Sequence, residues 1–466
     1  MTDFLNPRRA RASLFIVFLF LCLSLNLFPA GQARAAETDL DRMMSLTLHR
    51  SVLTRGVDMA TLESVLRRGE IVIVDETTGG DIPWLVAAGA MINAPPEEVW
   101  KTLSDFSRFP EWVPQTEKAI STVKGDRVDV AYTIGFRFGF IHTTINYSVA
   151  QRLDPPRRID WVGTGGDIKK TFGYMELFPA EGGKKTMFFY AAWAIPQHLL
   201  LRKFLESEPV LDMMISMSTA SVFVKKLKEQ VEKGKTASPP PAAESRADLV
   251  KTPVETLLAL SSRGPVLLFE DPTPEETAAG VEPLVTNWSI FNLPPEQVYQ
   301  EVTDYPQYGI YLPTVDKAEW IRQAGNTGEV EYKLTIQLPV LSKKTRYQLS
   351  EEFFPGQKVT WKYLKGDKFV NSGSWEIIPL EGGKKTLGFY RNRYTVQDLG
   401  TLANLVMKAI PDVQLAIKAV VSSTYIRATR DWLETPQSAK EPLKLLKKKK
   451  RIQEIRRLAE ERAIKQ

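Results

Sequence analysis

The sequence predicts an α+β protein made of two tandem copies of one domain, each a curved antiparallel sheet wrapped on a long C-terminal helix. Three observations predict it: a repeat of about 200 residues, alternating apolar runs typical of antiparallel strands, and a long apolar-striped segment ending each copy. An antiparallel sheet needs a cover for its apolar face, and one helix cannot fill the concave side of a curved sheet. A cavity between helix and sheet, lined by apolar and aromatic side chains, is therefore expected.

The repeat is clear in the sequence. Residues 161–190 and 361–390 share 14 identities in 30 ungapped positions, and both contain the run Glu-Gly-Gly-Lys-Lys-Thr. The run Asn-x-Pro-Pro-Glu-x-Val at 93–99 recurs at 292–298. A period this long corresponds to whole domains and not to solenoid units.

Composition marks the domain boundaries. Residues 233–246 are rich in Pro, Ser and Ala and are typical of a semi-extended linker. This linker separates a first module at 37–232 from a second module at 247–434. Residues 1–36 precede the modules, and residues 435–466 form a basic tail that is predicted to be helical.

The N-terminus has the three-part plan of a secretory signal peptide. Three arginines within 8–11 precede an apolar run at 14–28, and a small-x-small pattern predicts cleavage near Ala35/Ala36. The run is about 15 residues long, shorter than the roughly 20 that a spanning helix needs. We therefore expect a periplasmic or secreted protein, with a retained membrane anchor as the alternative.

The net charge is uneven along the chain. The total is +6, but residues 1–35 contribute +3 and residues 440–466 contribute +7, so the residues between them carry −4. A mildly acidic body argues against nucleic-acid binding, which needs a basic face. The only cysteine, Cys22, lies in the predicted signal peptide, so the mature chain would have no thiol for disulfides, nucleophilic catalysis or metal binding.

The first elements of the module are read from apolar spacing. Helical spacing covers residues 43–68, and short strands follow at 71–74 and 84–92. The run Pro-Pro-Glu at 95–97 opens a helix, because Pro and Glu fit a first helical turn. Apolar residues then alternate without a break over 128–140, which predicts a strand, and the second copy has the same phase.

The remaining elements complete the order of one module. Strands are predicted at 145–149 and 172–178, and the Glu-Gly-Gly-Lys run at 181–184 is typical of a hairpin turn. A long helix ends the copy, with Pro209 near its start, and Pro411 holds this place in the second copy.

With these elements the chain resembles the START-like superfamily, also called SRPBCC or the polyketide cyclase/dehydrase and lipid-transport group, and above all its coenzyme Q-binding START-type branch. The resemblance covers nearly all of both modules, although Gly309 stands where the first copy has Pro110. It implies the helix-grip fold but is weak for the ligand, because this fold hosts transporters, cyclases and receptors alike. It rests on Asn93-x-Pro95-Pro96-Glu97-x-Val99-Trp100, Asp105-Phe106-x-x-Phe109-Pro110-x-Trp112-Val113-Pro114, Trp161 and the terminal helix.

Aromatic and apolar residues of the strands and the terminal helix are the candidate ligand-binding residues. Any one of them can simply pack in the core, but as a set they predict a cavity, because the resembled fold makes one. The candidates in the two modules are Trp112, Phe136, Phe138, Phe140, Trp161, Tyr174, Met214, Met217, Tyr308, Ile336, Leu338, Trp361 and Trp375.

The sequence offers no catalytic or metal-binding constellation. His49, His142 and His198 are its three histidines, and none has the spacing of a metal site or an activated nucleophile. We predict no cofactor, and a hydrophobic ligand that is a lipid or a quinone- or isoprenoid-like molecule. The alternatives are a cyclase- or dehydratase-type enzyme, marked by inward-facing acid or base groups with shifted pKa values, and a non-catalytic interaction module, marked by filled cores.

The basic tail allows two interpretations. From Lys444 to Lys465 it combines clustered Lys and Arg with a narrow apolar stripe, so a helix here would be basic and amphipathic. Such helices contact anionic membrane surfaces, gaining about 1 kcal/mol per basic residue near the surface. A solvated helical tail is the alternative.

Overall fold

The computed structural model divides into two compact units, unit 1 (residues 1–285 and 400–420) and unit 2 (residues 286–399 and 421–466). The predicted signal peptide, most of the predicted linker and the stretch from Lys444 to Lys465 lie outside the residues that the structure describes, and these three assignments stay predictions. The described residues are 50–77, 84–125, 127–138, 141–196, 209–235, 253–338, 341–367, 369–396 and 413–441.

Unit 1 is built on an antiparallel sheet, which confirms the α+β class. Its strands follow the order β9-β1-β2-β8-β7-β6-β5-β4-β3. From β3 to β8 each strand pairs with its neighbour in the chain, as expected for a meander of hairpins. The strands are β1 (Gly69–Asp75), β2 (Leu85–Ile92), β3 (Thr116–Lys124), β4 (Arg127–Phe138), β5 (Ile141–Asp154), β6 (Arg158–Gly166), β7 (Ile168–Ala180), β8 (Lys185–Pro196) and β9 (Val266–Glu270).

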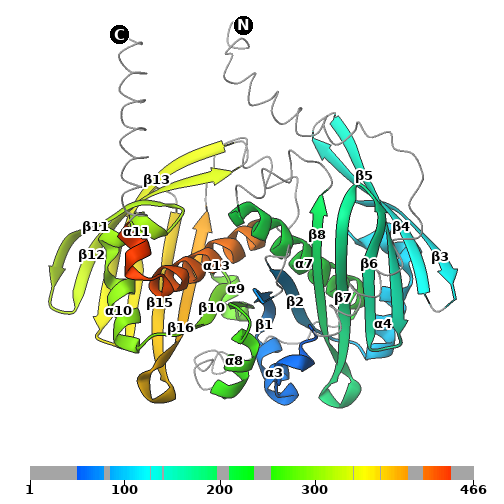
Figure 1. The fold of residues 1–466 in the computed structure, drawn as a ribbon, viewed down its shortest axis with the longest axis horizontal. Coiled ribbons are helices and arrows are strands. Elements are labelled where there is room, and N and C mark those ends of the chain that lie inside the picture. Colours follow the sequence, from blue (N-terminus) through cyan, green and yellow to red (C-terminus); the bar gives the residue numbers. More distant parts are fainter. Residues whose placement is uncertain are drawn as a thin grey trace, which may run out of the picture. The chain divides into compact units, whose positions relative to one another are not determined.

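One long helix packs on this sheet. Helix α7 contacts β2 and β8, and Figure 1 shows it crossing the strands of unit 1. Shorter helices complete the unit, together with the 3₁₀ turns η1 (Leu53–Arg55), η2 (Phe106–Arg108) and η3 (Glu181–Gly183). The helices are α3 (Met59–Leu66), α4 (Pro96–Ser104), α5 (Phe109–Trp112), α7 (Pro209–Val231), α8 (Val254–Ser261) and α9 (Pro274–Ala278).

The structure shows where two of the predicted helices begin. Helix α4 begins at Pro96, as its Pro-Pro-Glu opening predicts. The prediction of one continuous helix over 43–68 is wrong within the described residues, because helix α3 begins only at Met59. Gly56 ends the preceding 3₁₀ turn in the left-handed region (φ 69°), and the Asp58 carboxylate then accepts a hydrogen bond from the Thr61 amide at 2.8 Å. That bond caps a new helix.

Strands β1 and β9 of unit 1 are equivalent segments of the two copies. Strands β1 and β9 pair antiparallel, and two ion pairs flank them. Arg68 Nη2 lies 2.7 Å from Glu270 Oε2, and Arg263 Nη1 lies 3.5 Å from Asp75 Oδ2. Arg68 and Arg263 are equivalent residues of the two copies, each followed by a glycine, and Asp75 and Glu270 are the last residues of β1 and β9. The two ion pairs are therefore reciprocal, as at an isologous contact.

Unit 2 repeats the meander with its own strands and helices. Its strand order is β11-β12-β13-β14-β15-β16-β10, and α10 packs against β15 and β16. Tyr332 stands opposite Tyr347 in the β12–β13 pair, as Tyr132 stands opposite Tyr147 in the β4–β5 pair, so the register of the repeat is kept. The elements are β10 (Leu284–Phe291), α10 (Pro295–Thr303), α11 (Tyr305–Tyr311), β11 (Val315–Ala324), β12 (Thr327–Leu338), β13 (Leu341–Phe354), β14 (Lys358–Gly366), β15 (Phe369–Leu380), η6 (Glu381–Gly383), β16 (Lys385–Val396) and α13 (Val413–Glu434), of which the residues before Val421 belong to unit 1.

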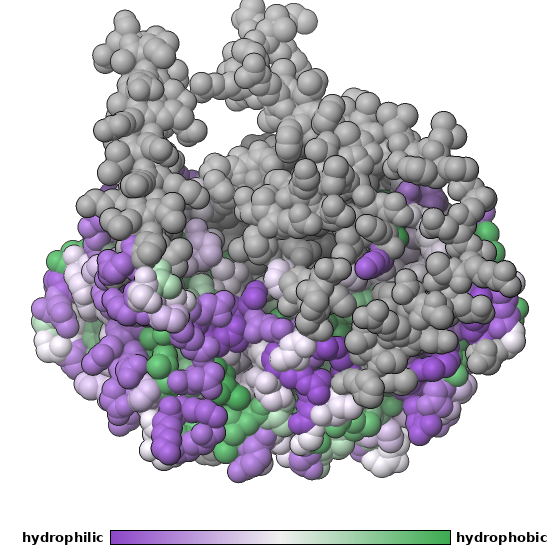
Figure 2. All heavy atoms as spheres, in the orientation of Figure 1, coloured by the Kyte–Doolittle hydropathy of each residue, from purple (hydrophilic) through white to green (hydrophobic). Residues whose placement is uncertain are grey.

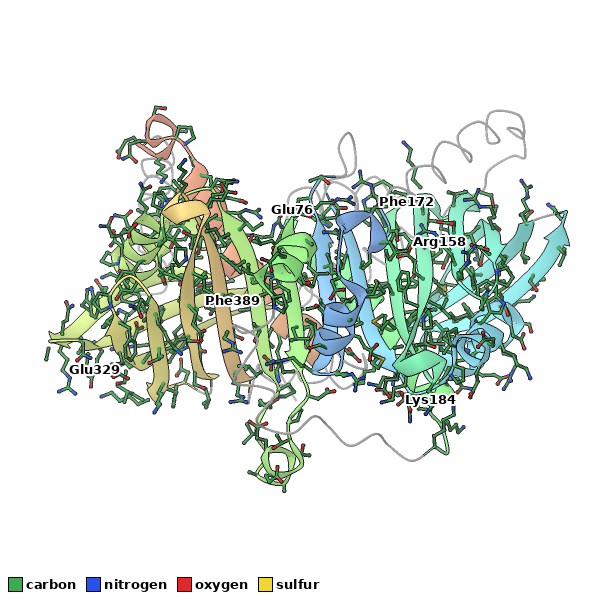
Figure 3. All side chains as sticks on the ribbon, turned by 90° about the horizontal axis from the view of Figure 1, so that it is seen from below. Glu76, Arg158, Phe172, Lys184, Glu329 and Phe389 are labelled. Carbon is green, nitrogen blue, oxygen red and sulfur yellow. The ribbon has the colours of Figure 1, made fainter. Side chains whose placement is uncertain are left out.

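The described surface is mostly polar. Figure 2 shows hydrophilic residues over much of the described surface on this face, with hydrophobic residues in smaller patches. The predicted hairpin turn is confirmed, since Gly182 is left-handed (φ 65°) between β7 and β8 and Lys184 lies at the tip (Figure 3). Within the described ranges, no helix has the length and apolar character needed to cross a membrane.

Candidate functional site

A cavity of about 430 Å³ lies in unit 1 between helix α7 and the sheet. Strands β4 to β8 supply one wall, α7 supplies the other, and the segment that follows α5 closes one side. The residues that line it are Phe109, Val113, Pro114, Gln115, Thr116, Tyr132, Ile134, Ile145, Tyr147, Val149, Gln151, Trp161, Ile168, Thr171, Met175, Tyr190, Ala192, Ala194, Ser218, Thr219, Val222 and Phe223.

Strand periodicity decides which side chains reach the cavity. Alternate residues of a strand point to one face of the sheet. Ile145, Tyr147, Val149 and Gln151 follow this period of two along β5, and all four line the cavity. Three of them are apolar or aromatic, so Gln151 is a polar residue in an apolar series.

Stacked aromatic rings form the wall where the sheet meets α7. The Phe223 ring of α7 stacks on the Tyr190 ring of β8, with centroids 4.3 Å apart and planes at 20°. Trp161 stacks on the same tyrosine at 5.3 Å, and Phe109 meets Phe223 edge-on at 6.1 Å. Because such contacts add to the energy of burial, they hold the wall in one arrangement.

A single hydrogen bond joins the two polar side chains at the β4–β5 end of the cavity. The Gln151 side chain is buried, and its Nε2 donates to Tyr132 Oη at 3.3 Å. Gln151 Oε1 is also buried and has no hydrogen-bond partner. A buried acceptor without a donor is uncommon and costs stability, so this oxygen calls for an explanation.

The lining of the cavity provides little acid–base chemistry. Its described lining residues include no Asp, Glu, His, Lys or Arg. Burial raises the pKa of Tyr147 to about 12 and raises the pKa of Tyr132 well above its usual value. These tyrosines stay protonated near neutral pH, so they can form hydrogen bonds but cannot act as bases there.

Unit 2 has a small cavity among the counterparts of several of these lining residues. Its cavity measures about 20 Å³, which is room for about one water molecule. The residues around it are Val302, Tyr305, Tyr308, Tyr332, Tyr347, Leu349, Glu351, Val359, Trp361, Asn371, Trp375, Tyr390 and Tyr425.

Larger and more polar side chains account for the difference between the two sites. Trp375 occupies the position that Met175 has in the first copy, and Tyr305 replaces Phe106. The position of Gln151 holds Glu351, whose carboxylate accepts hydrogen bonds from the Tyr305 and Tyr332 hydroxyls. Burial raises the pKa of Glu351 well above its usual value, so its carboxyl is an inward-facing acid beside a cavity that holds about one water molecule.

The structure distributes the sequence-predicted residues over several places. In unit 1, Trp161 lines the cavity, whereas Trp112 and Met217 are buried in the same apolar core beside it. In unit 2, three of the candidates surround the small cavity: Tyr308, Trp361 and Trp375. The side chains of the remaining candidates other than Tyr174 lie outside the described residues, namely Phe136, Phe138, Phe140, Met214, Ile336 and Leu338.

Tyr174 lies on the opposite face of β7 from Met175, because neighbouring residues of a strand point to opposite sides. Its hydroxyl donates to the Arg50 carbonyl at 2.8 Å, and the Arg158 guanidinium lies over its ring, 4.6 Å from the centroid. Arg158 Nη2 also forms an ion pair with Asp160 Oδ1 at 2.8 Å. Arg158 is labelled in Figure 3. Tyr174 therefore links the backbone at Arg50 to the sheet through a hydrogen bond, and it does not line the cavity.

Residues that the sequence analysis did not select complete the site. Gln151, Tyr190 and Phe223 contribute the polar group and the stacked wall. Gln151 could have been found as the next residue in phase after Ile145, Tyr147 and Val149. No group of His, Cys, Asp or Glu in the part of the chain that the structure describes could hold a metal ion.

Comparison with known proteins gives one family and several similar structures. The family described as "Polyketide cyclase / dehydrase and lipid transport" matches residues 84–208 and 285–421, one stretch in each copy. A search of curated proteins gives no match.

Solved structures match with low identity. A protein from Thermus thermophilus is 18% identical, with 33% of this chain and 99% of that chain covered and a TM-score of 0.29. The di-domain ARO/CYC BexL from the BE-7585A biosynthetic pathway is 12% identical, with 76% and 99% covered and a TM-score of 0.26. A fragment of a STAR-related lipid transfer protein from Xanthomonas axonopodis is 15% identical, with 37% and 94% covered and a TM-score of 0.27.

Proposed function

The chain belongs to the polyketide cyclase/dehydrase and lipid transport family, whose model matches more than half of its length in two copies, and we propose that it binds and carries a hydrophobic molecule in the unit 1 cavity. The observation that supports this most is the cavity of about 430 Å³ between α7 and the sheet, with its mainly apolar lining. Pockets of this size and lining bury most of a small apolar ligand.

The expected affinity follows from the area that binding removes from water. Hiding about 300 Å² of apolar ligand surface supplies about 7 kcal/mol before ordering costs. That corresponds to a dissociation constant on the order of micromolar. Such an affinity suits a carrier, which must release its ligand as well as bind it.

We further propose that the two copies have different functions and that each chain binds one ligand molecule. Unit 2 has a site of about 20 Å³, so its copy serves as a filled structural or interaction module. A cyclase-type enzyme receives less support. The described lining of the open cavity has no carboxylate or imidazole, and the buried acid Glu351 lies where no substrate fits.

We assign the helix-grip arrangement to both copies, supported in unit 1 by α7 packing against β2 and β8. We propose export to the periplasm or the medium, supported by the signal-peptide pattern before Ala35/Ala36. Sequencing the N-terminus of the secreted chain tests export, and an intact Met1 in a membrane fraction would argue for the retained anchor.

Filling the cavity tests the carrier function. Met175→Trp places in unit 1 the residue that unit 2 holds at the equivalent position, so strand β7 should accept it. We expect this variant to lose binding of the neutral dye N-phenyl-1-naphthylamine, measured by its fluorescence, while keeping its thermal unfolding transition. Tyr174→Phe changes the neighbouring residue on the opposite face of β7 and should bind dye like the wild type. Undiminished dye binding by folded Met175→Trp would reject the unit 1 cavity as the site.

A further inference from the structure

Gln151 holds a buried acceptor that the protein itself does not use. The side chain is 2% exposed and lines the cavity. Its amide nitrogen donates to Tyr132 Oη at 3.3 Å, and its Oε1 has no partner in the structure. Since a buried polar atom is almost always paired, we expect a donor in the cavity, from water or from a ligand that displaces it, to supply the missing hydrogen bond.

The second copy shows which group completes this position. In unit 2 the equivalent Glu351 accepts hydrogen bonds from the Tyr332 and Tyr305 hydroxyls, whereas Gln151 in unit 1 donates to the Tyr132 hydroxyl. The residue in the place of Tyr305 in unit 1 is Phe106, which has no hydroxyl. The protein thus supplies two donor hydroxyls to the side chain at this position in unit 2 and none to Gln151 Oε1 in unit 1.

We propose that the ligand of unit 1 is a neutral, hydroxyl-bearing hydrophobic molecule whose hydroxyl enters the cavity first and pairs with the Gln151 amide. The inference rests on the proposed carrier function and names its ligand class. A hydroxyl both donates and accepts, so it can serve the amide oxygen while accepting from a second donor. The apolar body then lies against the aromatic wall formed by Trp161, Tyr190 and Phe223.

The described lining residues carry no charged side chains, and most are apolar, which disfavours charged ligands. Burying a charged head group needs a partner of opposite charge, and the described lining residues provide none. A molecule without polar atoms would fill the space but would leave Gln151 Oε1 unpaired. A fatty acid held by its carboxylate end and a plain hydrocarbon are therefore both poorer matches than an alcohol.

Two probes that differ in one group test this assignment. Dodecan-1-ol carries a hydroxyl where tridecane has a methyl group, and each is titrated as a competitor of N-phenyl-1-naphthylamine on the full chain. The measured quantity is the change, from wild type to variant, in the ratio of the two dissociation constants, because the difference in hydrophobicity between the probes cancels in this comparison. Gln151→Met keeps the shape of the side chain and removes its amide. We expect it to weaken the alcohol relative to the alkane by about tenfold, as for one net hydrogen bond.

Two further variants separate recognition of the hydroxyl from changes of shape. Val149→Ala widens the cavity two residues away on the same face of β5 and should shift both probes equally. Phe106→Tyr copies unit 2, and we expect its hydroxyl to pair with Gln151 and to lower the preference for the alcohol as Gln151→Met does.

The outcomes separate this inference from the carrier function. If both probes bind and Gln151→Met shifts them equally, the hydroxyl assignment is overturned while the carrier function stands. If the dye does not bind the wild-type chain, both are overturned.

Discussion

Replacing Glu270 tests how the pair of strands β1 and β9 is stabilised. Glu270 Oε2 lies 2.7 Å from Arg68 Nη2, and the two side chains are 0% and 6% exposed. Glu270→Ala would leave a buried guanidinium without this charge partner at a place that water hardly reaches. We expect a loss of about 3 kcal/mol in the free energy of unfolding, at the lower end for a broken buried ion pair. This corresponds to roughly a hundredfold change in the unfolding equilibrium constant.

Two companion variants separate the ion pair from a general loss of packing. Arg67 lies next to Arg68 in the chain but pairs with Glu63 at the surface, where its own side chain is 48% exposed. Arg67→Ala should therefore cost well under about 1 kcal/mol. The double variant Arg68→Met/Glu270→Leu replaces both charges with apolar side chains, and we expect it to recover most of the loss.

Urea unfolding followed by tryptophan fluorescence measures these differences, with hydrogen exchange of the β1 amides as a local readout. The order of stability should be wild type, Arg67→Ala, the double variant and then Glu270→Ala. Equal and small losses for Glu270→Ala and Arg67→Ala would refute the reasoning, because the buried pair would then be worth no more than a surface pair.

Two other predictions concern buried polar groups. Burial raises the pKa of Glu351 above its usual 4.5, so the stability it contributes is full below that pH and is lost as the pH rises through the raised pKa. Glu351→Gln should therefore raise Tm at neutral pH and flatten the decline of Tm from acidic to neutral pH, and an unchanged Tm profile would contradict this. The Thr186 hydroxyl donates to the buried Ala94 carbonyl at 2.7 Å, and Thr386 repeats this bond in unit 2. Thr186→Val should cost about 1–2 kcal/mol by urea unfolding, and a loss near zero would show that the bond adds nothing.

Much of the fold could be predicted from the sequence because apolar periodicity and helix-start residues indicate the same secondary structure. Alternation of apolar residues predicts β5, and Pro-Pro-Glu predicts the start of α4 at Pro96. The repeat then supplies each assignment twice. Tyr174 shows the limit of this reasoning, since both faces of β7 are buried and alternation alone does not tell which face meets the cavity.

The difference between the two cavities could not be predicted in the same way. The free volume depends on how rings from distant elements pack, as when Phe223 of α7 stacks on Tyr190 of β8. The counterparts in unit 2 are Tyr425 and Tyr390, which stack almost as closely, with centroids 5.3 Å apart. The substitution that fills the space lies elsewhere, at Trp375, and its effect depends on the packing around it.

The central claim is that one hydrophobic molecule with a hydroxyl occupies the unit 1 cavity of each chain. Organic extraction of the purified mature protein, followed by mass spectrometry of the extract and by native mass spectrometry of the intact chain, tests it most directly. We expect one neutral, hydroxyl-bearing hydrophobic molecule per chain and none from Met175→Trp. An empty extract from wild-type protein that also fails to bind N-phenyl-1-naphthylamine would contradict it and would favour a non-catalytic interaction module.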